Sequence, residues 1–470
     1  MNRRKFIKQM GWTIAAGAMG INNVSGAVNL SNNMMKMRVG PKKYNVLFVL
    51  VDQWRFCAMS HGLHHDRLVK TPNLDKTAKS GAHWGRCYAT HPVCTPNRSA
   101  IITGRWPWQT GMNENDLMMP PGERCLAQEF TDAGYNCYYI GKWHMDGVAK
   151  PGYVPKGWRR RGFTKFEGFN RGHEYLNTKT FDDDGNLMPG LTGLYEPTIQ
   201  TDLAIKFIKE NRNHPFFCFV SWGAPHTPYG AHLGDFPYNA EDVVPRPNVP
   251  ADKISAAKNS LKDYFSHCSA MDYQFGRLMQ TLEDLKLDDD TLVVFTADHG
   301  DMHQSHAMTY KSKPEEESWH VPLIMRLPSK IKSGTVVNHL ISSADLMPTI
   351  LSICGFDVPA TCTGRDVSPA ITNPDFADES VYGGIRDSWR AVAKGDYKLV
   401  VEVLDGETTE TATKLYNVKA DPYEMDNLVN NAIYATVKTD LLAEIEKWKA
   451  KTSDSFPVKP WVAEKMYPDP

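Results

Sequence analysis

The sequence has almost no net charge. Its 53 Lys and Arg residues face 54 Asp and Glu residues, which gives a formal net charge of -1 over 470 residues. A chain of this kind has no global electrostatic field that would attract nucleic acid, so any recognition of an anion must be local. Cysteine is also scarce: there are nine residues and no C-x-x-C pair, which argues against a zinc site.

The first 27 residues have the composition of an export signal. A basic segment with Arg3 and Arg4 precedes a mildly apolar run from Trp12 to Met19, and Ser25-Gly26-Ala27 offers a cleavage site of small residues. The paired arginines resemble a bacterial twin-arginine signal, and an amphipathic N-terminal helix is the alternative. We predict a signal peptide over residues 1–27 and a periplasmic or secreted protein. No later apolar run approaches the length of a membrane span, so we expect no membrane anchor in the mature form.

Short apolar runs alternate with helical patterns through most of the chain, which predicts an α/β fold. We expect a large mixed, mostly parallel sheet between helices in an N-terminal domain over residues 41–370. Strands separated by turns and a final amphipathic helix in residues 371–470 predict a smaller C-terminal α+β subdomain with an antiparallel sheet and a helix. The expected strands are 44–51, 136–140, 216–221, 291–296, 321–325, 380–386, 390–404 and 414–418, and the expected helices are 197–211, 269–285, 344–353 and 432–449.

Two pairs of polar residues follow expected strands. Asp52-Gln53 comes directly after the first strand, and Asp298-His299 comes shortly after the strand over residues 291–296. Open α/β sheets bind ligands at the carboxyl ends of their strands, and hard divalent cations prefer oxygen ligands, which a His can join. The pairs could therefore hold one cation, although an Asp after a strand is more often a turn former or a helix cap.

Cys94 lies in a segment that places a nucleophile at the start of a helix. Pro96 suits the first turn of a helix that runs on to Gly104, so Cys94 lies beside its positive, donor-rich N-terminus. Arg98, one turn later, can turn its guanidinium towards the same site. The alternative is an ordinary buried cysteine.

The motif Cys94-Thr95-Pro96-Asn97-Arg98 resembles the C/S-x-P-x-R signature of the type I, formylglycine-dependent sulfatases of the alkaline phosphatase superfamily. Other segments of that family occur in the same order along nearly the whole mature chain: Val51-Asp52-Gln53, Gly141-Lys142-Trp143-His144, Pro225-His226-Thr227-Pro228, Ala297-Asp298-His299-Gly300-Asp301 and Lys311. The resemblance implies an alkaline-phosphatase-like fold, with residues 41–370 as the catalytic sulfatase domain.

The resemblance also implies the chemistry. A separate maturation enzyme would oxidise Cys94 to formylglycine, whose hydrated aldehyde attacks sulfur with one hydroxyl and expels sulfate with the other. One cation, calcium, would orient this group and the sulfate oxygens. Its ligands by motif match are Asp52, Gln53, Asp298, His299 and the modified Cys94.

The remaining motif residues receive roles from the same resemblance. Arg98 would hold the diol, Lys142 and Lys311 would bind sulfate oxygens, and His144 would remove the proton that expels sulfate. His226 would help to bind sulfate and protonate the leaving alkoxide. Taken singly, the two lysines have the alternative of solvated surface charges, and the two histidines that of hydrogen-bonded structural residues.

Two alternatives to a sulfatase stay open. Gln53 and His299 replace residues common in the family and resemble the branch of phosphonate monoester hydrolases and choline sulfatase, so a phosphonate monoesterase or phosphodiesterase is one alternative. A binding protein for sulfated glycans, never matured at Cys94, is the other. The expected substrate is a sulfated carbohydrate, and the arginines at 159–161, in a long insertion over residues 151–196, could contact an anionic sugar or form a solvated loop.

Overall fold

The computed structural model describes residues 42–463, except residues 63, 231–234, 374 and 378. The expected signal peptide over residues 1–27 lies outside the described residues. Within them, no helix is both long enough and apolar enough to cross a membrane. Residues from 43 onward form one compact unit.

A nine-stranded sheet forms the centre of this unit, with the strand order β4-β3-β5-β1-β6-β7-β2-β8 and β9 paired beside β2. Every pairing is parallel except those of β7, which runs antiparallel to both of its neighbours. The expectation of a large, mostly parallel sheet is therefore confirmed. The strands are β1 Asn45–Asp52, β2 Ala82–Tyr88, β3 Asn136–Lys142, β4 Lys165–Phe169, β5 Phe216–Pro225, β6 Thr291–Ala297, β7 His320–Arg326, β8 Thr335–Val337 and β9 Ile341–Ser342.

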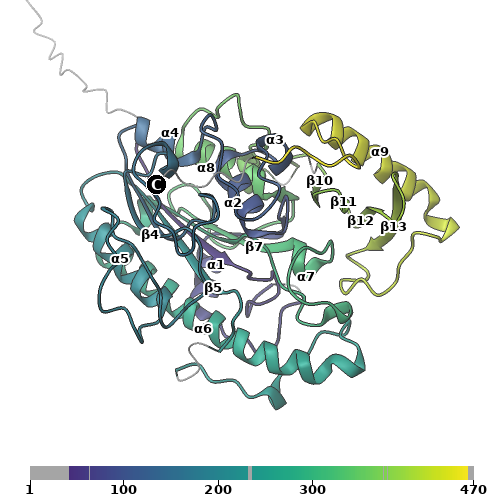
Figure 1. The fold of residues 1–470 in the computed structure, drawn as a ribbon, viewed down its shortest axis with the longest axis horizontal. Helices are drawn as coiled ribbons and strands as arrows, with labels where there is room; N and C mark the ends of the chain where they lie inside the picture. Colours follow the sequence, from purple (N-terminus) through teal and green to yellow (C-terminus); the bar gives the residue numbers. More distant parts are fainter. Residues whose placement is uncertain (1–41, 63, 231–234, 374, 378, 464–470) are drawn as a thin grey trace, which may run out of the picture. The chain divides into compact units, whose positions relative to one another are not determined.

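Helices cover both faces of the sheet. Helices α1 (Pro72–Ser80), α5 (Glu196–Glu210) and α6 (Ile254–Asp284) pack together on one face, and α2 (Cys94–Thr103), α4 (Leu126–Asp132) and α8 (Leu346–Cys354) lie on the other (Figure 1). All residues of β5 and β6 are consequently buried. Burial on both faces explains why these strands are nearly continuous apolar runs in the sequence.

Three elements of the N-terminal part differ from the sequence prediction. Helix α6 begins at Ile254, 15 residues before the expected start at residue 269, because its first turns are rich in polar residues that face solvent. The insertion over residues 151–196 is not wholly irregular, since it contains the short edge strand β4. Strand β2 was not expected, because His83, Gly85 and Arg86 interrupt its apolar pattern.

The C-terminal part forms the expected antiparallel sheet, with four strands in the order β10-β11-β12-β13 where the sequence predicted three, followed by the helix α9. The expected strand over residues 390–404 is in fact two strands, because the chain turns back at Gly395, whose φ of 56° favours glycine. Trp106 and Trp108 near α3 (Pro107–Thr110) pack in the core of this sheet, beside Trp448. The elements are β10 Val381–Ile385, β11 Trp389–Lys394, β12 Tyr397–Val403, β13 Glu410–Asn417 and α9 Ala435–Thr452.

Candidate active site

The two polar pairs lie side by side at the carboxyl edge of the sheet. Strands β1 and β6 are parallel neighbours, and Val51 pairs with Ala297 directly before the two pairs begin. The backbone N–H of Gln53 donates to Asp298 Oδ1 over 3.0 Å, which ties one pair to the other. Gln53 has a φ of 67°, a conformation uncommon for residues with a side chain. The topology thus brings together residues that are about 245 positions apart in the sequence.

Asp52, Cys94, Asp298 and His299 form a buried cluster whose potential metal-binding atoms all lie within 4.8 Å of one another. His299 Nε2 is 3.3 Å from Cys94 Sγ, 3.5 Å from Asp52 Oδ1 and 3.6 Å from Asp298 Oδ1. Two carboxylates and an imidazole suit a hard divalent cation. The side-chain oxygen of the neighbouring Gln53 is buried and has no hydrogen-bond partner among the described residues, so a further oxygen is available beside the cluster. The donor set therefore fits the expected cation.

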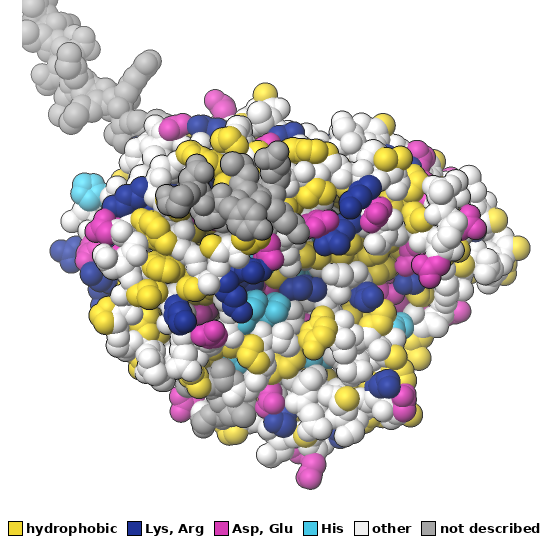
Figure 2. Space-filling view, in the orientation of Figure 1, with side chains coloured by type: hydrophobic (Ala, Val, Ile, Leu, Met, Phe, Trp, Pro, Cys, Tyr) yellow, Lys and Arg dark blue, Asp and Glu magenta, His cyan; other side chains and the backbone are white. Residues whose placement is uncertain are grey.

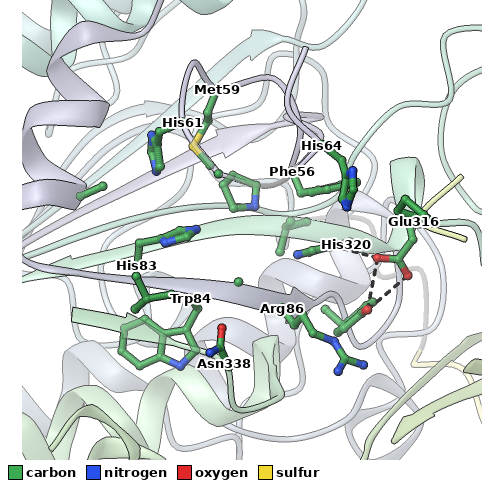
Figure 3. Close-up of a pocket in the computed structure, with 18 of the residues that line it drawn as sticks. Phe56, Met59, His61, His64, His83, Trp84, Arg86, Glu316, His320 and Asn338 are labelled. Atoms are coloured by element: carbon green, nitrogen blue, oxygen red, sulfur yellow. Dashed lines mark hydrogen bonds and ion pairs between the residues drawn. The ribbon is translucent and has the colours of Figure 1, made fainter. Parts of the chain in front are cut away.

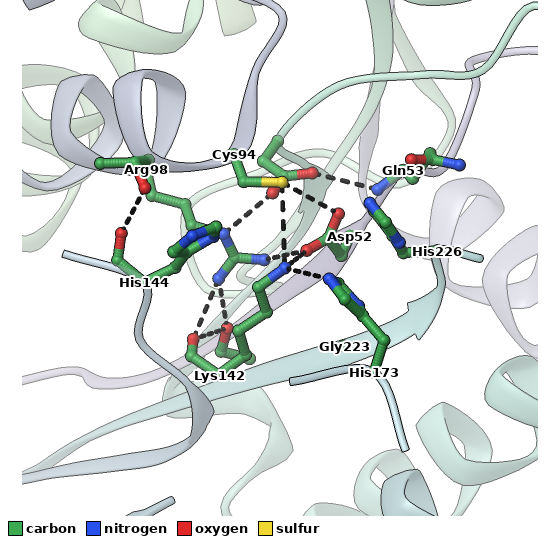
Figure 4. A network of polar contacts seen from close by, with 12 residues as sticks. Asp52, Gln53, Cys94, Arg98, Lys142, His144, His173, Gly223 and His226 are labelled. Atoms are coloured by element: carbon green, nitrogen blue, oxygen red, sulfur yellow. Dashed lines mark hydrogen bonds and ion pairs between the residues drawn. The ribbon is translucent and has the colours of Figure 1, made fainter. Parts of the chain in front are cut away.

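Cys94 is the first residue of α2, as the sequence predicts, and its side chain is buried. The Asn115 side chain accepts a hydrogen bond from the Thr95 N–H over 3.1 Å and so satisfies one free donor of this helix end. Lys142 Nζ is 3.8 Å from the sulfur (Figure 4), and Lys311 Nζ is 3.0 Å from it. Burial and Asp52 oppose ionisation of Cys94, yet the two ammonium groups hold the pKa of its thiol well below the ordinary value.

Arg98 connects the two strand ends from the next turn of α2. Its guanidinium donates to Asp298 Oδ2 over 2.9 Å and to Asp52 Oδ2 over 3.2 Å, and it also reaches the Ser221 hydroxyl at 2.7 Å. Burial opposes the charge on Asp52, yet Lys142, His226 and Arg98 hold the pKa of its carboxyl well below the usual range. Arg98 therefore orients both carboxylates of the cluster and keeps Asp52 ionised.

Lys311 and His226 form a pair beside Cys94. Lys311 Nζ lies 2.9 Å from His226 Nε2, and His226 Nδ1 lies 2.9 Å from the Thr227 carbonyl oxygen. An ammonium only donates and a carbonyl only accepts, so the ring is neutral, with its proton on Nδ1. Burial and the Lys311 charge lower the pKa of His226 to about 4, in agreement with this state. Tyr310 and Ser312, on either side of Lys311 in the chain, both have positive φ.

His173 completes this wall of the site. Its ring stacks on that of His226 with centroids 3.9 Å apart, and its Nε2 is 3.5 Å from Lys142 Nζ. Lys142 Nζ in turn contacts Asp52 Oδ2. Sequence reasoning assigned no role to His173, because this residue stands in an insertion without a motif.

His144 faces a carboxylate that the sequence did not single out. Its Nε2 lies 2.9 Å from Asp116 Oδ1, and Arg171 forms an ion pair with the other oxygen of Asp116. Both His144 and Asp116 have positive φ, 60° and 67°. His144 Nδ1 is buried without a hydrogen-bond partner among the described residues. Asp116 gave no signal in the sequence, because an Asp in a polar loop is ordinary turn chemistry.

These residues surround a cavity of about 280 Å³, here called the reaction cavity. Its lining carries three cationic side chains and one carboxylate, and this local excess of positive charge suits an anion. On the face of the molecule in Figure 2, basic and acidic side chains are interspersed. The cavity is lined by Cys94, Asn115, Asp116, His144, Lys150, Arg171, Gly172, His173, His226 and Lys311.

A larger cavity, of about 840 Å³, lies elsewhere and shares no lining residue with the reaction cavity (Figure 3). Its walls include aromatic rings and histidines, among them Phe56 stacked on His320 at 4.1 Å. The lining includes no cysteine, and no potential metal cluster among the described residues falls on it. The smaller cavity, with its activated sulfur, is therefore the candidate active site.

The arginines at 159–161 do not line the reaction cavity. Arg159 donates to both oxygens of Asp146, and Arg160 forms an ion pair with Asp183. Arg161 donates to backbone carbonyls, and both Arg160 and Arg161 are buried. Arg160 is thus bonded within the insertion, whereas Arg159 and Arg161 connect it to segments that precede it in the chain. These roles differ from both expectations, an anionic sugar contact and a solvated loop.

All nine cysteines are free, and Cys94 is the one whose pKa is lowered. Burial raises the pKa of Cys57, Cys125 and Cys137 to about 12. Since the thiolate is the reactive form, the surroundings of Cys94 single it out chemically from the other buried cysteines.

Comparisons with known proteins cover both sheets. The family described as Sulfatase matches residues 44–356, and the family described as N-sulphoglucosamine sulphohydrolase, C-terminal, matches residues 306–451. The ulvan-active sulfatase of Formosa agariphila is 32% identical over 88% of this chain and 83% of its own. The N-acetylglucosamine-6-O-sulfatase of Bacteroides thetaiotaomicron is 25% identical over 92% of this chain and 90% of its own. The crystal structure of yidJ from Bacteroides fragilis matches with a TM-score of 0.80 at 26% identity, over 88% of this chain and 97% of that one.

Proposed function

Because the chain belongs to the sulfatase family of the alkaline phosphatase superfamily and is a sulfuric ester hydrolase, we propose that it removes sulfate from a sulfated carbohydrate. We further propose that it acts through a formylglycine made from Cys94 and through one calcium ion. The relatives named as acting on ulvan and on N-acetylglucosamine support a carbohydrate substrate. The observation that carries the proposal is the position of Cys94 Sγ, within 4.8 Å of three potential cation ligands and 3.0 Å from an ammonium group.

The two implied groups would supply chemistry that the unmodified chain lacks. Formylglycine would supply geminal hydroxyls for attack on sulfur and for release of sulfate, which a single hydroxyl or thiol cannot provide. Calcium, held by Asp52, Gln53, Asp298 and His299, would withdraw charge from the sulfate oxygens. Arg98 keeps the two Asp carboxylates oriented for this purpose, through hydrogen bonds of 3.2 and 2.9 Å.

Lys142 and Lys311 would bind the sulfate oxygens from two sides of Cys94, where both ammonium groups already face the sulfur. The leaving alkoxide needs a proton, since it is too basic to depart unaided near neutral pH. His226 Nε2 carries no proton in this structure and accepts from Lys311. We therefore assign delivery of the leaving-group proton to the Lys311–His226 pair, with Lys311 as its source.

His144 would accept the proton that accompanies release of sulfate. A carboxylate only accepts hydrogen bonds, so Asp116 fixes the His144 proton on Nε2 and leaves Nδ1 as the basic atom of the neutral ring. A histidine oriented by a carboxylate is the arrangement that general-base catalysis needs. Asp116 is thus a positioning residue for His144.

Peptide mass spectrometry across Cys94, on protein from the native host, tests the nucleophile. Conversion of the thiol to an aldehyde lowers the mass of the peptide by about one water equivalent. An intact thiol would contradict the formylglycine mechanism and favour an unmatured glycan-binding protein.

Steady-state assays of the matured enzyme test the reaction class. The quantity that measures discrimination between substrates is kcat/KM. We expect it to be higher for sulfate esters of sugars than for phosphonate monoesters or phosphodiesters. A preference for phosphonates by orders of magnitude would make the enzyme a phosphonate monoester hydrolase.

We also propose export from a bacterial cell, with residues 1–27 removed, residues 41–370 as the catalytic domain and residues 371–470 as a subdomain. The basic and apolar segments of the N-terminus support this proposal. N-terminal sequencing of the protein from periplasm and culture medium tests it. Recovery of the full-length chain in the cytoplasm alone would contradict export.

A further inference from the structure

Another cavity, of about 270 Å³ and here called the second cavity, adjoins the reaction cavity. Lys150, Arg171 and Gly172 line both cavities, so a ligand that passes these residues enters the second one. Each cavity alone is smaller than the roughly 300–1,000 Å³ typical of ligand sites, and together they fall within that range. The two cavities therefore fit a ligand of more than one unit. The second cavity is lined by Lys150, Pro151, Phe169, Arg171, Gly172, Glu174, Thr178, Lys179 and Glu196.

Three cationic side chains stand around this second cavity. Lys150 and Lys179 are exposed, and neither forms an ion pair within the described part of the chain. Arg171 forms an ion pair with Asp116 through one of its terminal nitrogens, and its side chain remains 29% exposed. The two lysines are therefore available to a ligand, and Arg171 is available in part.

The acidic residues of the second cavity do not cancel this charge. Glu174 is exposed at the rim. Glu196 is buried, and burial raises the pKa of its carboxyl to about 7, so that a substantial fraction is neutral near neutral pH. Two fully charged lysines and a partly paired arginine thus outweigh one full and one partial negative charge.

We propose that the second cavity binds an anionic group, a carboxylate or a second sulfate ester, on the sugar next to the one that loses sulfate. This inference rests on the proposed function, because the reaction cavity must hold the scissile sulfate for the neighbouring sugar to reach Lys150 and Lys179. The substrate is then a sulfated oligosaccharide with negative charge on adjacent units. Lys150 and Lys179 determine specificity and take no part in the chemical step.

Equilibrium binding to the Cys94→Ala protein, loaded with calcium, tests the inference without turnover. The probes are three disaccharides that share one sulfated unit and differ in the other, which is neutral, carboxylated or sulfated. We expect the anionic probes to bind about three- to tenfold more tightly than the neutral one at low salt, as two or three exposed ion pairs provide. The preference should shrink as the salt concentration rises. The tighter of the two anionic probes identifies the anion.

The variant Lys150→Gln/Lys179→Gln should bind all three probes with nearly equal affinity. The control Lys206→Gln/Lys209→Gln removes two exposed lysines from α5, neither of which lines the cavity, and should keep the preference. Equal binding of the three probes by the parent protein, or an unchanged preference in the Lys150/Lys179 variant, would overturn the inference. If the Cys94→Ala protein discriminates between the probes but the matured enzyme releases no sulfate, the proposed function is wrong and the inference of an anion site is still supported.

Discussion

Replacing Asp116 by Asn should slow the enzyme through His144, because the substitution keeps the size of the side chain and removes its charge. In the native protein the carboxylate accepts a hydrogen bond from His144 Nε2 over 2.9 Å, and His144 Nδ1 is left unprotonated in the neutral ring. An Asn side chain can donate as well as accept, so it no longer fixes the tautomer. It also removes the negative charge that stabilises His144 after proton uptake.

The size of this effect follows from the geometry of the pair. A hydrogen bond to a charged group contributes about 1.5–3 kcal/mol, which corresponds to a factor of about 10 to 150 in rate. The Asp116 side chain is 26% exposed, and Arg171 shares its charge, so solvent and the ion pair weaken the bond. We therefore expect kcat to fall by about 10- to 30-fold, with KM changed less than twofold.

Stopped-flow and steady-state kinetics with a chromogenic aryl sulfate measure the effect. If His144 acts on release of sulfate, Asp116→Asn should release one equivalent of alcohol in a fast burst and then turn over slowly. Asp116→Glu should recover part of the rate. The control Asp202→Asn breaks an exposed pair with Arg277 and should leave the kinetics unchanged. A change in KM alone, or a slow first turnover without a burst, would refute the role assigned to Asp116.

Three further predictions concern the cation and the stability of the fold. If the buried cluster holds calcium as proposed, a chelator should abolish turnover and lower Tm, because the buried carboxylates of Asp52 and Asp298 would lose the cation that compensates their charge. Added calcium should restore both turnover and Tm. An unchanged Tm would argue against a buried ion. Burial raises the folded-state pKa of Glu196 from 4.5 to about 7, so the contribution of Glu196 to stability is present below pH 4.5 and is lost as pH rises through 7. In urea titrations, Glu196→Gln should therefore be more stable than the parent by about 3 kcal/mol at pH 8 and equally stable at pH 4.5. An equal difference at both pH values would contradict the assignment. Trp448→Ala should cost about 3–5 kcal/mol and lower Tm, because the buried ring packs on Trp106 and Tyr382, and a loss below 1 kcal/mol would show that this core is not needed for stability.

Much of the site could be predicted from the sequence, because the positions of several site residues depend on their neighbours in the chain. The position of Cys94 at the start of a helix follows from the residues around it, and Asp52 and Asp298 follow strands that are recognisable as apolar runs. Parallel strands end at one edge of their sheet, so the sequence also allowed these residues to meet at one cation. Helix α6 and strand β2 were mispredicted where polar residues disturb the local pattern.

The amino-acid sequence by itself determined the α/β fold, the strands that the site residues follow and the chemical types of those residues. The order of the strands in the sheet came from the tertiary structure. Only the tertiary structure decided that Asp116 orients His144, that His173 stacks on His226 and that Lys311 donates to His226. It also decided that the arginines at 159–161 hold the insertion in place through contacts within it and with earlier segments, and do not line the cavity. The physical reason is that periodicity and capping depend on neighbours along the chain, whereas these contacts join loops whose positions are set by packing across the whole molecule.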